Sequence, residues 1–120
     1  MHIIKLFNSF SNAFDGIKIL LKEQNFRIHL IATIVVALFA FYLNFNYLEW
    51  GLVLLCIGFV IALEAINTAI EKICDLISKE ESLLIKQIKD VSASAVLIQA
   101  IISLIIAMII LNKIFDFIAF

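Results

Sequence analysis

The chain has 120 residues, 64% of them hydrophobic, and its mean hydropathy is +1.13. Soluble domains are about half apolar, and a chain this short leaves much of its surface exposed to solvent, so the excess excludes an ordinary water-soluble domain. The formal net charge of −1 says little about partners, although we expect no nucleic acid among them. The sequence has no proline and only three glycines, which favours long helices over β-structure.

The chain opens with an amphipathic segment between residues 3 and 22. Apolar residues recur there at steps of three and four, with lysine, asparagine, serine and aspartate between them. This spacing predicts a helix whose apolar face lies in the membrane interface, with packing of the helix on the rest of the protein as the alternative. The apolar positions are Ile3, Phe7, Phe10, Phe14, Ile17 and Leu21.

Three further segments are apolar enough to cross a bilayer, for which a helix needs about 20 mostly apolar residues. The second of them continues as a charged helix to residue 77, and the third is broken only by Lys113 and Asp116. The sequence therefore predicts an all-α membrane protein of a single domain, residues 1–120, with a surface helix and three transmembrane helices. The predicted spans cover residues 28–43, 48–70 and 91–118.

The basic residues gather on one side of these spans. Eight of the nine lysine and arginine residues precede the first span or lie between the second and the third, and only Lys113 lies near the C-terminus. The turn between the first two spans, residues 44–49, contains none. Because lysine and arginine are enriched in cytoplasmic loops, we predict a multi-pass membrane protein with its N-terminus in the cytoplasm and its C-terminus outside.

One polar stripe lies where the second span leaves the bilayer. At about 100° per residue, Glu64, Asn67, Glu71 and Asp75 fall within about 80° of one another on a helix. With a hydrocarbon core of about 30 Å, Glu64 lies at its inner edge and Glu71 in the interface. A carboxylate at this depth is costly and points to a functional site. The alternative is that Glu64 pairs with a lysine or stays protonated and holds helices together.

Further charged residues are predicted at the same face. Lys89 suits a phosphate, and Asp90 could orient that lysine or help to bind a metal. Glu23 precedes the first span; alone it is typical of a solvated helix end, and His29 is typical of a packing or interface residue. Carboxylates from two regions with a lysine fit a Mg²⁺–nucleotide site better than an ion pathway. No glycine-rich phosphate loop is present, so these residues alone do not single out a kinase.

Two segments together resemble a known family. The sequence EAINTAIE at residues 64–71, followed eighteen residues after Glu71 by KDV, resembles the signature of the prokaryotic diacylglycerol kinase and undecaprenol kinase family, and EQNFRIH at residues 23–29 resembles the family's entry into its first span. The resemblance covers essentially the whole chain. It implies ATP-dependent phosphorylation of a lipid hydroxyl, of diacylglycerol or of undecaprenol, at the cytoplasmic face of the bacterial inner membrane. It also implies a homotrimer whose active sites are shared between subunits.

The resemblance also implies roles for single residues. Glu64 resembles the general base that acts on the lipid hydroxyl. Glu23 and Glu71 resemble the carboxylates that bind Mg²⁺, and both of them, with Lys89 and Asp90, resemble the contacts to ATP.

The expected contacts to the lipid substrate are Glu64, Asn67 and Lys5, and Asn67 would also support the metal and phosphate geometry. The N-terminal segment departs from the family pattern in two ways. Asn12 stands where a tyrosine is common, and the spacing from Gly16 to Glu23 is one residue shorter than expected. These departures concern the surface helix and leave the catalytic stripe intact.

Other readings of the sequence remain open at this point. A small proton- or ion-coupled transporter using Glu64 would need polar groups in the outer half of the helices, but residues 48–63 contain none beyond Glu49. A haem-binding anchor would have to use His2 and His29, which lie far apart in the sequence. Between the two lipids, the segments RIH at residues 27–29 and LEW at residues 48–50 look more like the undecaprenol kinase branch.

Overall fold

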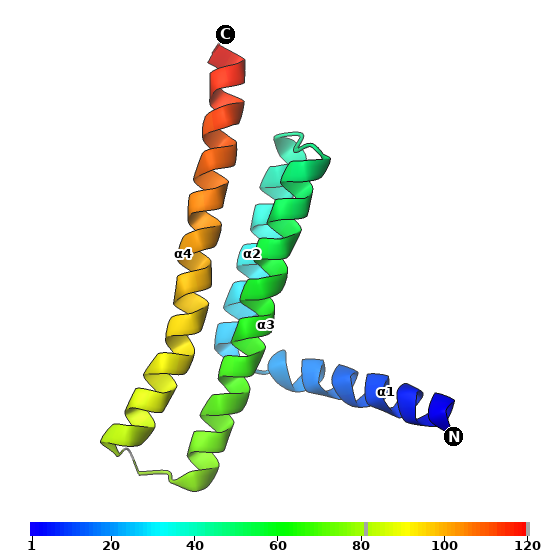
Figure 1. The fold of residues 1–120 in the computed structure, drawn as a ribbon, viewed down its shortest axis with the longest axis vertical. Helices are drawn as coiled ribbons and strands as arrows, with labels where there is room; N and C mark the ends of the chain where they lie inside the picture. Colours follow the sequence, from blue (N-terminus) through cyan, green and yellow to red (C-terminus); the bar gives the residue numbers. More distant parts are fainter. Residues whose placement is uncertain (81, 120) are drawn as a thin grey trace.

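The computed structural model describes residues 1–80 and 82–119, and these residues form four helices in the order α1 (His2–Leu20), α2 (Gln24–Tyr42), α3 (Tyr47–Ile77) and α4 (Leu83–Ala119). Three of them run side by side along the long axis of the molecule, whereas α1 leaves this bundle at a steep angle (Figure 1). The prediction of an all-α protein with one amphipathic N-terminal helix and three long apolar helices is therefore confirmed.

The helices α2, α3 and α4 are each long and apolar enough to cross a membrane. With 31 and 37 residues, α3 and α4 measure about 47 and 56 Å at about 1.5 Å per residue. A hydrocarbon core is about 30 Å thick, so both helices extend well beyond it. The large apolar side chains of all three helices are mostly exposed, which suits a surface that faces lipid.

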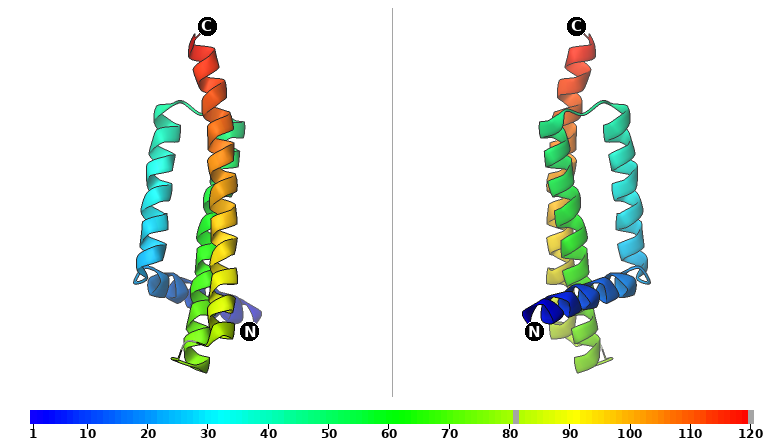
Figure 2. Two further views of the ribbon diagram at one scale, coloured as in Figure 1. Left: turned by 90° about the vertical axis from the view of Figure 1, so that its left-hand side faces the viewer. Right: turned by 90° about the vertical axis from the view of Figure 1, so that its right-hand side faces the viewer.

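The central helix of the bundle is α3, which contacts both α2 and α4. Figure 2 shows α2 set off to one side of the α3–α4 pair. The few buried apolar side chains are mainly of small or medium size, as expected where helices approach closely in a membrane. They are Phe26, Ala40, Val53, Val60, Cys74, Ile85, Val96 and Ile110.

A tight turn joins α2 to α3. Asn44 adopts a φ of 56°, in the left-handed region that asparagine tolerates better than most residues. The side chain of Asn46 then accepts a hydrogen bond from the backbone N–H of Glu49, and the backbone N–H of Asn46 donates to Oε1 of Glu49, both at 2.9 Å. This reciprocal capping box satisfies two backbone donors and fixes the start of α3.

The opposite end of the bundle carries the other two connections (Figure 1). Residues 21–23 join α1 to α2, and Ser82 begins α4 by accepting a hydrogen bond from the backbone N–H of Ile85 at 3.1 Å. The helix α1 buries none of its residues in this single chain. Its apolar face is therefore available to a lipid surface or to another subunit.

Candidate functional site

The polar stripe of α3 begins inside the bundle. Glu64 and Asn67 retain only 3% and 4% of their exposed area, and Thr68 is also buried. The side-chain amide of Asn67 donates to Oε1 of Glu71 at 3.2 Å, and the Thr68 hydroxyl donates to the backbone carbonyl of Glu64 at 3.0 Å. The spacing of three and four residues along the helix thus gathers these polar groups on one face, as the sequence predicts.

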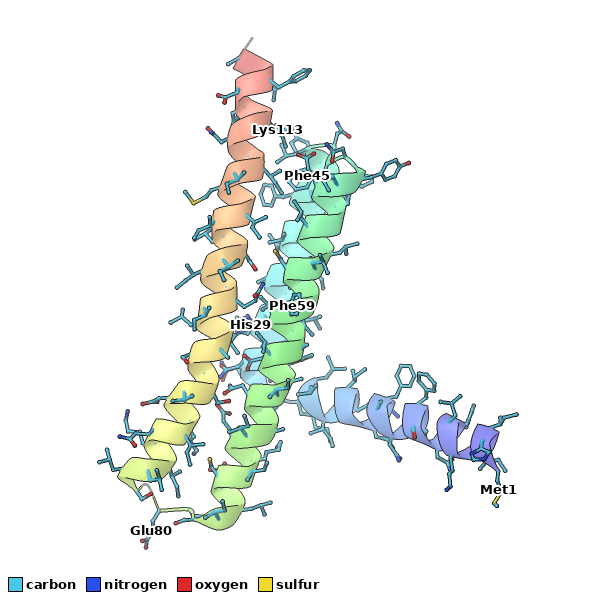
Figure 3. All side chains as sticks on the ribbon, viewed as in Figure 1. Met1, His29, Phe45, Phe59, Glu80 and Lys113 are labelled. Carbon is cyan, nitrogen blue, oxygen red and sulfur yellow. The ribbon has the colours of Figure 1, made fainter. Side chains whose placement is uncertain are left out.

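The helix α2 brings a histidine to this stripe. Nε2 of His29 lies 3.5 Å from Oε2 of Glu64, with 30% of the His29 side chain exposed and only 4% of the Glu64 side chain. Figure 3 shows His29 in the space between the helices. The buried carboxylate is therefore in contact with an ionisable ring from a neighbouring helix.

A second contact between α2 and α3 lies nearer the end of the bundle. Nζ of Lys72 is 3.1 Å from Oε1 of Glu23, the residue that immediately precedes α2. Between the two contacts, the chain advances six residues along α2, from Glu23 to His29. Over the same distance it goes back eight residues along α3, from Lys72 to Glu64. Both contacts therefore belong to one antiparallel register, which also brings Glu23 to the level of Glu71, the neighbour of Lys72.

The helix α4 joins the site through a lysine–aspartate pair with α3 and carries a second such pair within itself. Nζ of Lys89 in α4 donates to Oδ1 of Asp75 in α3 at 2.9 Å. Asp90 accepts a hydrogen bond from Nζ of Lys86 at 2.6 Å, one turn earlier on α4. Successive helix residues point in different directions, so the neighbours Lys89 and Asp90 take part in different pairs.

Lys5, expected near the lipid substrate, lies away from these residues within one chain. It is close to the N-terminus of α1, and Figure 1 shows that this end of the helix is the farther one from α3. From Lys5 to Leu20 the helix is about 22 Å long. A single chain therefore does not bring Lys5 to Glu64 and Asn67.

The stripe offers oxygen atoms that suit a hard metal ion. Oδ1 of Asn67 is buried and has no hydrogen-bond partner among the described residues, and the same side chain contacts Glu71. Within residues 1–80 and 82–119, no three His, Cys, Asp or Glu side chains are grouped closely enough to hold a metal alone. A Mg²⁺ ion that arrives with a nucleotide needs only one or two carboxylates, because phosphates and water complete its shell. Glu71 and Asn67, which contact each other, supply oxygen atoms of that kind. Glu23, the other expected carboxylate, is paired with Lys72, the neighbour of Glu71.

An apolar cavity of about 430 Å³ begins at His29, the residue that contacts Glu64. It is lined by α2, α3 and α4 and reaches from His29 to Phe45 in the turn at the other end of α2. Its lining includes Val36, Ala40 and Val60. One end of this cavity is therefore formed by His29, the residue that contacts Glu64, and the remainder is lined mostly by apolar side chains.

Two of the residues in these contacts were not expected from the sequence. His29 was expected to be a packing or interface residue, and Lys72 was counted only as a basic residue of the cytoplasmic side. The interval between Glu23 and His29 nearly equals that between Glu71 and Glu64. If Glu23 and Glu71 lie at the same depth in the membrane, His29 and Glu64 also lie at nearly the same depth. This equal spacing is the signal that could have identified His29.

Comparison with known proteins identifies the family. The model of the prokaryotic diacylglycerol kinase family matches residues 11–111. The undecaprenol kinase of Bacillus subtilis strain 168 is 38% identical over 107 residues, which cover 88% of this chain and 87% of the relative. Diacylglycerol kinases of Helicobacter pylori strains J99 and 26695 are 36% and 35% identical over 95 residues, covering 78% of this chain and 74% of each relative. The chain therefore belongs to the prokaryotic diacylglycerol kinase family of membrane-embedded lipid kinases.

Proposed function

We propose that the chain transfers the γ-phosphoryl group of ATP to the hydroxyl of a membrane lipid at the cytoplasmic face of the bilayer. The observation that carries this proposal is the buried Glu64, which lies on one helix face with Asn67 and Glu71 and contacts His29 of α2. A carboxylate buried beside an apolar cavity can meet a lipid hydroxyl from the membrane. The more exposed charges toward the end of the bundle can meet a nucleotide from water.

Glu64 is the general base of the proposed reaction. Its carboxylate accepts the proton as the O–H bond of the lipid breaks, the lipid oxygen forms a bond to the γ-phosphorus, and the bond from that phosphorus to ADP breaks. Such a transfer depends mainly on positioning and on neutralisation of charge. A deep pocket around the phosphates is therefore unnecessary.

The expected metal is Mg²⁺, bound through Glu23 and Glu71 with support from Asn67. When bound with ATP, it neutralises charge on the phosphates. Asn67 Oδ1 and the Glu71 carboxylate supply oxygen atoms of the kind that this ion prefers. The amide of Asn67 also holds Glu71 in place, because it donates to Oε1.

Lys89 and Asp90 are the proposed contacts to ATP from α4. The Asp75 carboxylate orients the Lys89 ammonium group, whose side chain is 31% exposed and can meet a phosphate from the aqueous side. Lys5 acts from another subunit, because within one chain it lies at the far end of α1. A homotrimer satisfies this requirement and would also cover the polar stripe and the unburied apolar face of α1.

The proposed orientation places the N-terminus in the cytoplasm and the C-terminus outside. The ion pairs of Lys72 and Lys89 lie at the end of the bundle that carries the α1–α2 and α3–α4 connections. Lysine-rich connections favour the cytoplasmic side, where ATP is available.

The test is transfer of labelled phosphate from ATP by purified protein in mixed detergent–lipid micelles. Undecaprenol and diacylglycerol are offered separately, each with Mg²⁺ and with excess chelator. We expect Mg²⁺-dependent transfer to at least one lipid, and the lipid with the higher kcat/KM identifies the substrate class. No transfer to either lipid by folded protein would contradict the proposal.

A further inference from the structure

The polar side chains beside Glu64 on α3 donate their hydrogen bonds elsewhere. The Thr68 hydroxyl donates to the backbone carbonyl of Glu64, and the Asn67 amide donates to Glu71. The carboxylate of Glu64 is instead met by His29, a residue of another helix, with Nε2 at 3.5 Å from Oε2. The orientation of this buried carboxylate therefore depends on how α2 packs against α3.

Two contacts hold the beginning of α2, just before His29, against the bundle. Phe26, one turn earlier, is 4% exposed and anchors the beginning of α2 in the bundle. The pair between Glu23 and Lys72 at 3.1 Å ties the same end of α2 to α3. The imidazole is thus placed beside Glu64 by two contacts that precede it in the sequence.

We propose that His29 is a positioning residue for Glu64, which deepens the proposed kinase function and rests on it. Nε2–H of His29 donates to Oε2 of Glu64 and fixes the carboxylate, so that Oε1 accepts the proton of the lipid hydroxyl. The distance of 3.5 Å exceeds that of a short hydrogen bond, and such contacts commonly tighten when the substrate is bound. His29 keeps its own proton during the reaction.

The first test compares two substitutions of the same histidine. His29→Gln keeps an N–H donor at a similar reach, and His29→Leu removes the donor while keeping an apolar side chain beside the cavity. We expect His29→Leu to lower kcat about 10- to 100-fold, with KM for the lipid unchanged. Removing a side chain that orients a metal-binding residue has an effect of this size. We expect His29→Gln to restore most of that loss. His2→Leu, at the other histidine of the chain, is the matched control and should leave both constants unchanged.

Glu64→Gln supplies the background that separates positioning from packing. If His29 acts through Glu64, adding His29→Leu to Glu64→Gln lowers the residual rate no further, because residues that act as a unit are non-additive. Equal losses in both backgrounds, a rise in KM alone, or an unchanged kcat in His29→Leu would each overturn the inference. A wild-type protein with no transfer activity would instead overturn the proposed function itself.

A second measurement needs no activity. Protein labelled with ¹⁵N at histidine is compared by NMR with and without Glu64→Gln. We expect the ring nitrogens of His29 to shift and those of His2 to stay in place. Identical His29 spectra in the two proteins would overturn the contact on which the inference rests.

Discussion

The helix α3 carries two buried carboxylates, Glu49 near its beginning and Glu64 near the ion pairs, and their surroundings differ. Glu49 and Glu64 retain 7% and 3% of their exposed area, and they lie fifteen residues, or about 22 Å, apart along the same helix. Glu49 lies in the first turn of α3, next to the loop from α2, and Glu64 lies toward the end that carries the ion pairs. Burial alone therefore does not distinguish their roles.

Their partners distinguish them. Glu49 caps its own helix with Asn46, beside the edge-to-face contact of Phe45 and Trp50 at 6.4 Å between ring centroids. The carboxylate of Glu64 is met by a side chain of α2. Oε1 of Glu49 is held within its own first turn, while its Oε2 is buried without a hydrogen-bond partner among the described residues. We therefore expect Glu49 to serve the start of the helix, and Glu64, which is met from α2, to serve the reaction. Substitutions at the two ends of α3 should therefore affect different properties.

Apart from Glu64 itself, the largest effect is expected at Glu71. Glu71→Gln keeps the hydrogen bond from Asn67 but removes the charge that would bind Mg²⁺, so the rate at fixed low Mg²⁺ should fall at least about 100-fold, in the range typical of lost charge stabilisation. Titrating the rate with Mg²⁺ should show a higher requirement for the metal. An unchanged Mg²⁺ dependence in a folded variant would show that Glu71 does not bind the ion.

A smaller effect is expected at Lys89. Lys89→Met should raise KM for ATP about tenfold, which corresponds to about 1.4 kcal/mol of lost binding. Lys113→Met, near the other end of α4, is the matched control and should leave KM for ATP unchanged. Steady-state kinetics with varied ATP measure KM for each variant. Equal changes in KM for Lys89→Met and Lys113→Met would show that the two ends of α4 do not differ in ATP binding.

The smallest effect on activity is expected at Glu49. Glu49→Ala breaks the capping box and should lower the free energy of unfolding by about 1 kcal/mol, with phosphate transfer unchanged at temperatures where the protein stays folded. Thermal unfolding in micelles measures this loss, with Glu49→Gln as a variant that keeps an acceptor for the Asn46 N–H. A large loss of activity without loss of stability would show that the outer carboxylate also serves the reaction.

Much of the fold follows from local features of the sequence. The four helices follow from the periodicity of residues 3–22 and from three long apolar runs, and the row from Glu64 to Glu71 follows from helical spacing alone. The helix α3 ends at Ile77, where the sequence places the end of its charged continuation. The helix α4 begins at Leu83, before the predicted span, because helix formation continues past the hydrocarbon where charged residues can face water.

The contacts between helices were harder to predict. The meeting of His29 with Glu64, and of Glu23 with Lys72, depends on the register in which α2 packs against α3. A hydropathy pattern places each helix in the membrane but does not fix its height or rotation relative to a neighbour. The expected role of Lys5 came from family resemblance, and it requires a second subunit.

The most direct test of the difference between the two carboxylates compares Glu64→Gln with Glu49→Gln in the same phosphate-transfer assay. Both variants replace one buried carboxylate of α3 by its neutral isostere. We expect Glu64→Gln to lose about 10²- to 10⁴-fold in kcat, the typical contribution of a general base, and Glu49→Gln to retain wild-type activity. Full activity in folded Glu64→Gln would contradict the assignment of Glu64 as the base.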